Sequence, residues 1–140
     1  MEKQLQICSY EQAEHLKNLG FDWECDFFFD GSDLKYAGSQ EVGLEDDILS
    51  YQNWNHKDLD WNDGVQKPYT SAPTVALALK WIRDVKKYLS GIDRFFENKK
   101  FRYVICHIEK NNNSAIKSNG IFDTYEAAES ALLDELLTLL

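Results

Sequence analysis

The stretch that decides the fold is APTVALALKWIRDVKKYLSGIDRFFENKKFRYVICHIE, residues 72–109. Pro73 stands where the first turn of a helix tolerates proline, and apolar side chains then recur at helical spacing. These apolar residues are Val75, Ala78, Leu79, Ile82, Val85 and Leu89. The pattern predicts a helix over about residues 72–89 that stops at Ser90 and Gly91.

Three strands are expected after this helix. Runs rich in apolar residues at about 92–97 and 101–109 flank the short turn 98–100, which predicts an antiparallel hairpin. The second run has apolar residues on both faces, as a central strand would. A weaker strand is expected at about 115–121.

The C-terminal segment predicts another long helix. Asp123 and Glu126 have the spacing of a capping box. An apolar stripe follows at Tyr125, Ala128, Leu132, Leu136 and Leu139. We therefore expect an α+β fold in which an antiparallel sheet has helices packed on one face, with the C-terminal half in helix-strand-strand-strand-helix order.

The N-terminal half gives a clear signal only at its start. Ser9 and Gln12 form a capping box, and Gly20 suits the end of a helix over about residues 10–19. Residues 21–29 alternate apolar and acidic side chains before an aromatic run, which predicts one strand.

The next stretch, residues 32–69, is punctuated by glycine and proline, so we expect loops with one short element near 44–51. The chain then divides into residues 1–70, with a helix, a strand and an acidic aromatic loop region, and the αβββα module of residues 71–140. We expect the two to form one compact unit.

Charge is distributed unequally along the 140 residues, which carry a formal net charge of -9. Residues 1–70 hold 5 basic and 15 acidic side chains, whereas residues 71–140 hold 10 and 9. The first half therefore repels nucleic acid and membrane surfaces and attracts basic proteins. No long apolar run and no basic, apolar leader is present, and the 3 cysteines are scattered, so we expect a cytoplasmic protein with free thiols and no membrane contact.

Four aromatic residues in the acidic region are candidates for partner binding: Tyr51, Trp54, Trp61 and Tyr69. Aromatic side chains on loops are frequent anchors of protein interfaces. They equally well fold inward as a small core beneath a long loop. The sequence leaves both interpretations open.

Six basic residues form a second candidate site. Lys80, Arg83 and Lys87 share one face of the predicted helix. Lys99, Lys100 and Arg102 belong to the hairpin. Ordered cations of this kind bind phosphate in nucleic acid, but a solvated helix face has the same pattern.

No catalytic, cofactor or metal motif is recognised. Cys106 and His107 are adjacent on a predicted strand, so their side chains point to opposite faces and do not converge. Residues 58–64 are similar to the start of a calcium loop, but the glycine comes one residue late and Tyr69 occupies the closing position. We expect no enzyme activity, no cofactor and no specific metal site.

Three patches resemble small uncharacterised proteins encoded by bacterial phages and mobile elements. The patches are 8–13 with 19–22, 72–83, and 122–129. That family has no established activity, so the resemblance implies a genomic setting and no functional residues. We expect a non-enzymatic accessory protein that contacts a host or phage protein through its acidic aromatic region.

The order helix, three strands, helix also resembles the double-stranded-RNA-binding domain, which reads shape and phosphates. In that family, lysines at the start of the second helix bind the backbone. Here the corresponding turn carries Asp123, Glu126 and Glu129, which repel phosphate. Nucleic-acid binding through the six basic residues is the alternative function, and we expect a protein partner instead.

Overall fold

A computed structural model describes eight stretches of the chain: residues 6–36, 53–55, 60–61, 65–66, 69–94, 99–107, 116–117 and 120–140. They belong to two compact units, Ile7–Pro73 and Met1–Gln6 with Thr74–Leu140. We call these the N-terminal unit and the C-terminal unit. Both combine helices with antiparallel strands, so the expected α+β class is confirmed. That the two units form one compact body stays a prediction.

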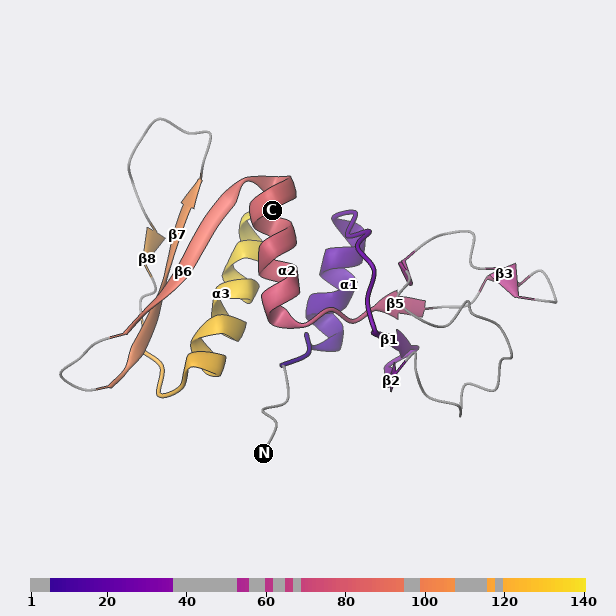
Figure 1. The fold of residues 1–140 in the computed structure, drawn as a ribbon, viewed down its shortest axis with the longest axis horizontal. Helices are drawn as coiled ribbons and strands as arrows, with labels where there is room; N and C mark the ends of the chain where they lie inside the picture. The colour runs from indigo at the N-terminus through magenta and orange to yellow at the C-terminus, as the bar shows by residue number, and fades with distance from the viewer. Residues whose placement is uncertain are drawn as a thin grey trace. The chain divides into compact units, whose positions relative to one another are not determined.

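The C-terminal unit has the predicted order of elements (Figure 1). The elements are α2 (Val75–Trp81), the π-helical turn η3 (Ile82–Lys86), β6 (Tyr88–Arg94), β7 (Phe101–His107), β8 (Ile116–Lys117) and α3 (Tyr125–Leu139). The strands form an antiparallel sheet in the order β6-β7-β8. Strand β7 is central, as its apolar residues on both faces predict.

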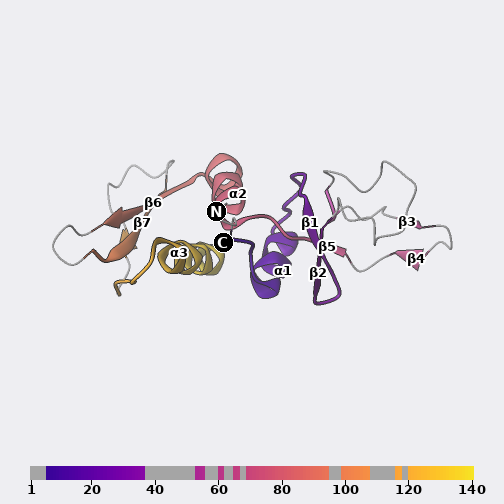
Figure 2. The same cartoon turned by 60° about the horizontal axis from the view of Figure 1, so that its bottom comes forward.

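Helix α3 covers one face of the β6–β7 hairpin, and α2 packs along α3 (Figures 1 and 2). The hairpin pairs seven residues on each strand, from Tyr88 with His107 to Arg94 with Phe101. The buried apolar side chains come from both helices, η3 and β7: Val75, Ala78, Trp81, Ile82, Ile105, Ala128, Leu132, Leu133, Leu136 and Leu137. The helical periodicity of the sequence thus selects part of this core, whereas Val85, Tyr125 and Leu139 of the predicted stripes are 47%, 46% and 39% exposed.

The predicted helix 72–89 is wrong at its C-terminal end. Helix α2 begins after Thr74, whose Oγ1 accepts a hydrogen bond from the main-chain nitrogen of Leu77 at 3.0 Å. After the π-helical turn, Lys87 adopts a left-handed conformation with φ 66°, and β6 starts at the next residue. Pairing with β7 therefore overrides the helical pattern, and Leu89 is left 50% exposed.

The last helix also has a different cap from the predicted one. Thr124, not Asp123, is the N-cap, and its Oγ1 accepts a hydrogen bond from the main-chain nitrogen of Ala127 at 3.1 Å. Asp123 instead forms an exposed ion pair with Lys100. Both residue types are good caps, so the sequence pattern did not distinguish neighbouring positions.

The N-terminal unit begins with the predicted helix. Helix α1 (Tyr10–Asn18) has the full capping box between Ser9 and Gln12. After the helix, Gly20 adopts φ 95°, a conformation that side-chain-bearing residues rarely adopt. Both ends of α1 therefore follow the local sequence.

Three strands of this unit form an antiparallel sheet in the order β2-β1-β5. They are β1 (Phe27–Asp30), β2 (Asp33–Tyr36) and β5 (Tyr69–Ser71), while β3 (Asp60–Trp61) pairs with β4 (Val65–Gln66). Gly31, with φ 63°, occupies the first central position of the two-residue turn between β1 and β2. This placement suits a tight hairpin turn.

The predicted strand over 21–29 is too long, and the loop expected over 32–69 contains strands. The main-chain nitrogen of Phe21 bonds the carbonyl of Leu16 at 3.0 Å, so the chain after α1 first completes the helix end. Strand β1 starts only at Phe27. The short element predicted near 44–51 lies outside the described residues.

The two faces of this sheet pack against different segments. Phe29 lies with Ala13 of α1 and with Ala72 in one buried cluster, and Phe27 packs against it. Phe28 points to the opposite face, because successive side chains of a strand alternate. There it stacks on Trp54, with ring centroids 4.0 Å apart.

Candidate functional site

Trp54, the first of the predicted partner-binding aromatics, is a core residue. Its side chain is only 1% exposed. Its indole Nε1 donates a hydrogen bond to the carbonyl of Cys25 at 2.9 Å, and its main-chain nitrogen donates to Ser71 Oγ at 2.9 Å. The inward interpretation therefore holds for Trp54, and a partner does not reach this ring in the folded state.

Tyr69 belongs to the same aromatic cluster and is partly buried. Its ring centroid lies 4.8 Å from that of Phe28 and 5.7 Å from that of Trp54. Burial, and to a lesser degree the charge of Asp30, raise the pKa of its phenol above the ordinary value. Tyr51 and the side chain of Trp61 lie outside the described residues.

The displayed apolar side chains of the N-terminal unit lie instead on β2. All four residues of this strand are exposed, and Leu34 and Tyr36 are 47% and 49% exposed. The loops expected over residues 32–69 do not include this strand, so its surface is absent from the predicted sites. The alternation of Asp33, Leu34, Lys35 and Tyr36 after a glycine turn was the signal available.

The hydrogen-bonding pattern of β1 determines which peptide groups of β2 point toward its outer edge. The carbonyl of Phe27 accepts a hydrogen bond from the nitrogen of Ala72 at 3.0 Å, so the peptide groups of Phe27 face β5. Tyr36, the partner of Phe27, is then in a non-hydrogen-bonded pair. By the same alternation, the N–H and C=O groups of Leu34 and Tyr36 point away from β1, toward the outer edge of β2.

Exposed acidic side chains outnumber exposed lysines in the described part of the N-terminal unit. Within the described part of the N-terminal unit, seven carboxylates are exposed: Glu11, Glu14, Asp22, Glu24, Asp26, Asp30 and Asp33. The exposed lysines there are Lys17 and Lys35. Lys17 donates a hydrogen bond to the carbonyl of Tyr69 at 2.9 Å. The surface thus combines negative charge with two displayed apolar side chains.

The six predicted nucleic-acid contacts are distributed over the C-terminal unit, and three of them pair with carboxylates. Arg83 Nε lies 2.9 Å from Asp84, and Arg102 Nε lies 3.5 Å from Asp93. Lys100 pairs with Asp123. The hydrogen bond from Arg83 is the main cause that lowers the pKa of Asp84. These carboxylates reduce the local positive charge available to phosphate.

The other three cations occupy different positions. Lys80 is exposed on α2. It shares one face with Arg83 as predicted, since both line a cavity between α2, β6 and α3. Lys87 and Lys99 are both exposed and adopt positive φ angles of 66° and 55°. Lys87 therefore follows the end of the helical segment and does not continue the predicted basic face.

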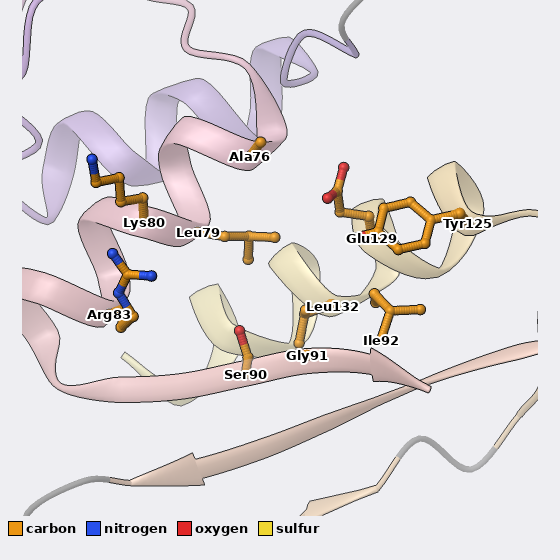
Figure 3. Close-up of a pocket in the computed structure, with 10 residues that line it drawn as sticks. All are labelled: Ala76, Leu79, Lys80, Arg83, Ser90, Gly91, Ile92, Tyr125, Glu129 and Leu132. Atoms are coloured by element: carbon orange, nitrogen blue, oxygen red, sulfur yellow. The ribbon is translucent and has the colours of Figure 1, made fainter. Parts of the chain in front are cut away.

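A cavity of about 240 Å³ lies in the C-terminal unit between α2, β6 and α3 (Figure 3). Its lining combines apolar, basic and acidic side chains: Ala76, Leu79, Lys80, Arg83, Ser90, Gly91, Ile92, Tyr125, Glu129 and Leu132. We call it the α2–β6 groove. Burial raises the pKa of Glu129, whereas its hydrogen bond with Tyr125 opposes that shift.

No cluster of three or more histidine, cysteine or acidic side chains suited to a metal ion occurs among the described residues. The calcium-like stretch 58–64 is described only at the main chain of Asp60 and Trp61. The helices of the described stretches are too short or too polar to cross a membrane.

Comparison of the chain with protein-family models, with curated proteins and with solved structures finds no match.

Proposed function

We propose that this protein acts by contact with another protein, without chemistry of its own, and that the outer edge of β2 receives an extended basic segment of the partner. The observation that carries the proposal is the exposure of all four residues of β2, Leu34 and Tyr36 included, in a unit whose described exposed charges are mostly acidic. Trp54 is buried, so the proposed contact uses this strand and not the ring of Trp54.

The main chain of β2 supplies the first part of the contact. The peptide groups of Leu34 and Tyr36 point outward, so an added strand finds hydrogen-bond donors and acceptors at alternate positions. Among the described residues, β2 is an edge strand, and no described strand pairs with its outer side. Strand addition at such an edge is a common mode of peptide recognition.

Side chains supply specificity. Leu34 and Tyr36 lie opposite Phe29 and Phe27, and the rings of Tyr36 and Phe27 are 5.0 Å apart, so they continue the apolar face of β1 to the edge. An apolar side chain of the partner packs there. Exposed carboxylates such as Asp30 and Asp33 favour lysine or arginine at neighbouring positions, by charge complementarity.

The resemblance of three sequence patches to phage and mobile-element proteins supports the setting that we propose. The protein is then a cytoplasmic accessory protein of such an element, and its partner is a host or phage protein. The excess of acidic over basic side chains in residues 1–70 supports a basic partner.

Fluorescence anisotropy with a defined probe tests the proposal. The probe is a fluorescein-labelled octapeptide of alternating valine and lysine, titrated with the full chain at low salt. We expect binding that weakens as salt rises, and weaker binding of a matched valine–glutamine peptide, which carries no charge. Leu34→Lys is expected to lower the affinity about tenfold, because it removes apolar contact and adds repulsion.

Leu89→Lys is the matched control, since Leu89 is 50% exposed and Leu34 is 47% exposed, but Leu89 lies on β6. Circular dichroism and the unfolding midpoint verify that both variants fold. The proposal fails if both variants bind alike, if the valine–glutamine peptide binds equally well, or if the basic peptide does not bind at low salt.

A further inference from the structure

The α2–β6 groove separates opposite charges across an apolar floor (Figure 3). Lys80 and Arg83 stand at one end, and Tyr125 and Glu129 stand at the other. The floor between them is formed by Leu79, Ile92 and Leu132. A ligand bound along the groove contacts the two cations at one end, the apolar floor in the middle, and the carboxylate and phenol at the other end.

Helix and strand geometry bring these groups together. Lys80 and Arg83 are three positions apart and therefore project from neighbouring points of the α2–η3 segment. Tyr125 and Glu129 are four positions apart on α3, where they form a side-chain hydrogen bond. Strand β6 runs along the third side and is an edge strand of the described sheet. The sequence grouped Lys80 with Arg83 but did not place them beside α3.

The size and shape of the groove indicate the class of ligand. Its volume of about 240 Å³ is below the roughly 300–1,000 Å³ of cavities that enclose drug-sized molecules. It holds one or two side chains. A groove between an edge strand and a helix instead suits an extended chain, whose main chain runs along the strand while alternate side chains enter the groove.

We propose that the α2–β6 groove is a peptide-binding site, and that its ligand is an extended segment with an apolar side chain followed by a carboxylate. The apolar side chain packs on Leu79, Ile92 and Leu132. The carboxylate lies against Lys80 and Arg83. These side chains are positively charged, opposite in sign to the acidic side chains near the edge of β2. Asp84 bonds Arg83 at Nε, so the contact with the ligand uses Lys80 and the other nitrogens of the guanidinium.

This site is independent of the proposed edge contact. The groove belongs to the C-terminal unit and selects an acidic ligand, whereas β2 belongs to the N-terminal unit and selects a basic one. Each inference therefore has its own probe, and variants of one surface serve as controls for the other.

The test is a titration of the full chain against a fluorescein-labelled hexapeptide that has leucine at alternate positions and ends in two aspartates with an amidated C-terminus. The comparison peptide has asparagine in place of aspartate. We expect the aspartate peptide to bind at least about tenfold more tightly, because the asparagine peptide gives no charge for Lys80 and Arg83. Lys80→Glu is expected to remove most of that difference.

Steric variants provide a second measurement. Ala76 is exposed and lines the groove, so Ala76→Trp fills the groove without disturbing the core. Ala127→Trp is its matched control, because Ala127 is exposed on α3 and does not line the groove. We expect Ala76→Trp to lower the affinity about tenfold and Ala127→Trp to leave it within about twofold.

Lys35→Glu gives the same change of charge as Lys80→Glu on the other unit and is expected to leave the affinity unchanged. Equal binding of the two peptides, equal effects of the two tryptophan variants, or no binding of the aspartate peptide would overturn the proposal. Loss of binding with Leu34→Lys would overturn it as well, because that variant changes only the edge of β2.

Discussion

The indole Nε1 of Trp54 donates a hydrogen bond of 2.9 Å to the main-chain carbonyl of Cys25. The two residues are 29 positions apart, so this contact ties a short described segment to the chain that leads into β1. Asn55 reinforces it, since its side chain bonds the carbonyl of Phe21 and the nitrogen of Ser71, each at 2.9 Å. Trp54 thus stabilises the N-terminal unit.

Trp54→Ala is expected to lower the free energy of unfolding of this unit by about 3–5 kcal/mol, because a large cavity is left beside Phe28. Trp54→Phe is expected to cost less, about 1–3 kcal/mol, mainly by leaving the Cys25 carbonyl without its donor. Tyr36→Phe, at an exposed ring, is the control. Urea unfolding measures the free energy of unfolding of all three variants. Ordinary surface substitutions change it by about 0.5 kcal/mol or less, and a change that small for Trp54→Ala would contradict the assigned role.

The thiol of Cys25 should be unreactive in the folded protein. Burial raises its pKa to about 12, the charge of Asp26 acts in the same direction, and a hydrogen bond with Ser71 opposes them. Because the thiolate is the nucleophile, we expect slow labelling of Cys25 by an aromatic disulfide at pH 8 and full labelling after unfolding. Mass spectrometry of the labelled peptides identifies the site, and rapid labelling of native Cys25 would refute the expectation.

The same shift makes stability depend on pH in the alkaline range. The folded pKa lies above that of an unfolded thiol, which is about 8.5, so the contribution is complete below that value and is lost as pH rises toward the folded pKa. We expect Cys25→Ala to flatten the fall in unfolding free energy above about pH 8.5. If the unfolding free energy falls with pH equally steeply in the parent chain and in the variant, Cys25 does not contribute to this pH dependence.

Thr124 and Asp123 distinguish the observed helix cap from the predicted one. Thr124→Ala removes the hydrogen bond to Ala127 and is expected to destabilise the C-terminal unit by about 1 kcal/mol. Asp123→Ala removes only an exposed ion pair with Lys100, which is worth about 0–1 kcal/mol. Thermal unfolding of the two variants compares them, and a larger loss for Asp123→Ala would reverse the assignment.

Nucleic-acid binding through the basic residues is expected to be weak. Arg83, Lys100 and Arg102 have carboxylates beside them, and the chain carries a net charge of -9. We expect no mobility shift of single- or double-stranded probes at physiological salt. A shift at that salt that disappears with Lys80→Glu and Arg83→Glu would favour the alternative function.

The candidate sites depend on tertiary structure to different degrees. The common face of Lys80 and Arg83 follows from helical spacing alone. Their position across an apolar floor from Tyr125 and Glu129 does not, because it requires α3 to pack beside α2. Likewise, the aromatic residues of the acidic region are visible in the sequence, but only packing places Trp54 in the core and leaves Leu34 and Tyr36 displayed.

The sequence alone determined the features that neighbouring residues control. The capping box of α1, the turn at Gly20 and the order of elements after Pro73 all rest on local hydrogen bonds and on apolar periodicity. Tertiary structure decided the rest: the change from helix to strand at Lys87, the pairing of β1 with β5 and the burial of Trp54. Each of these depends on a partner distant in the chain, and the free energy of such long-range pairing exceeds local preference.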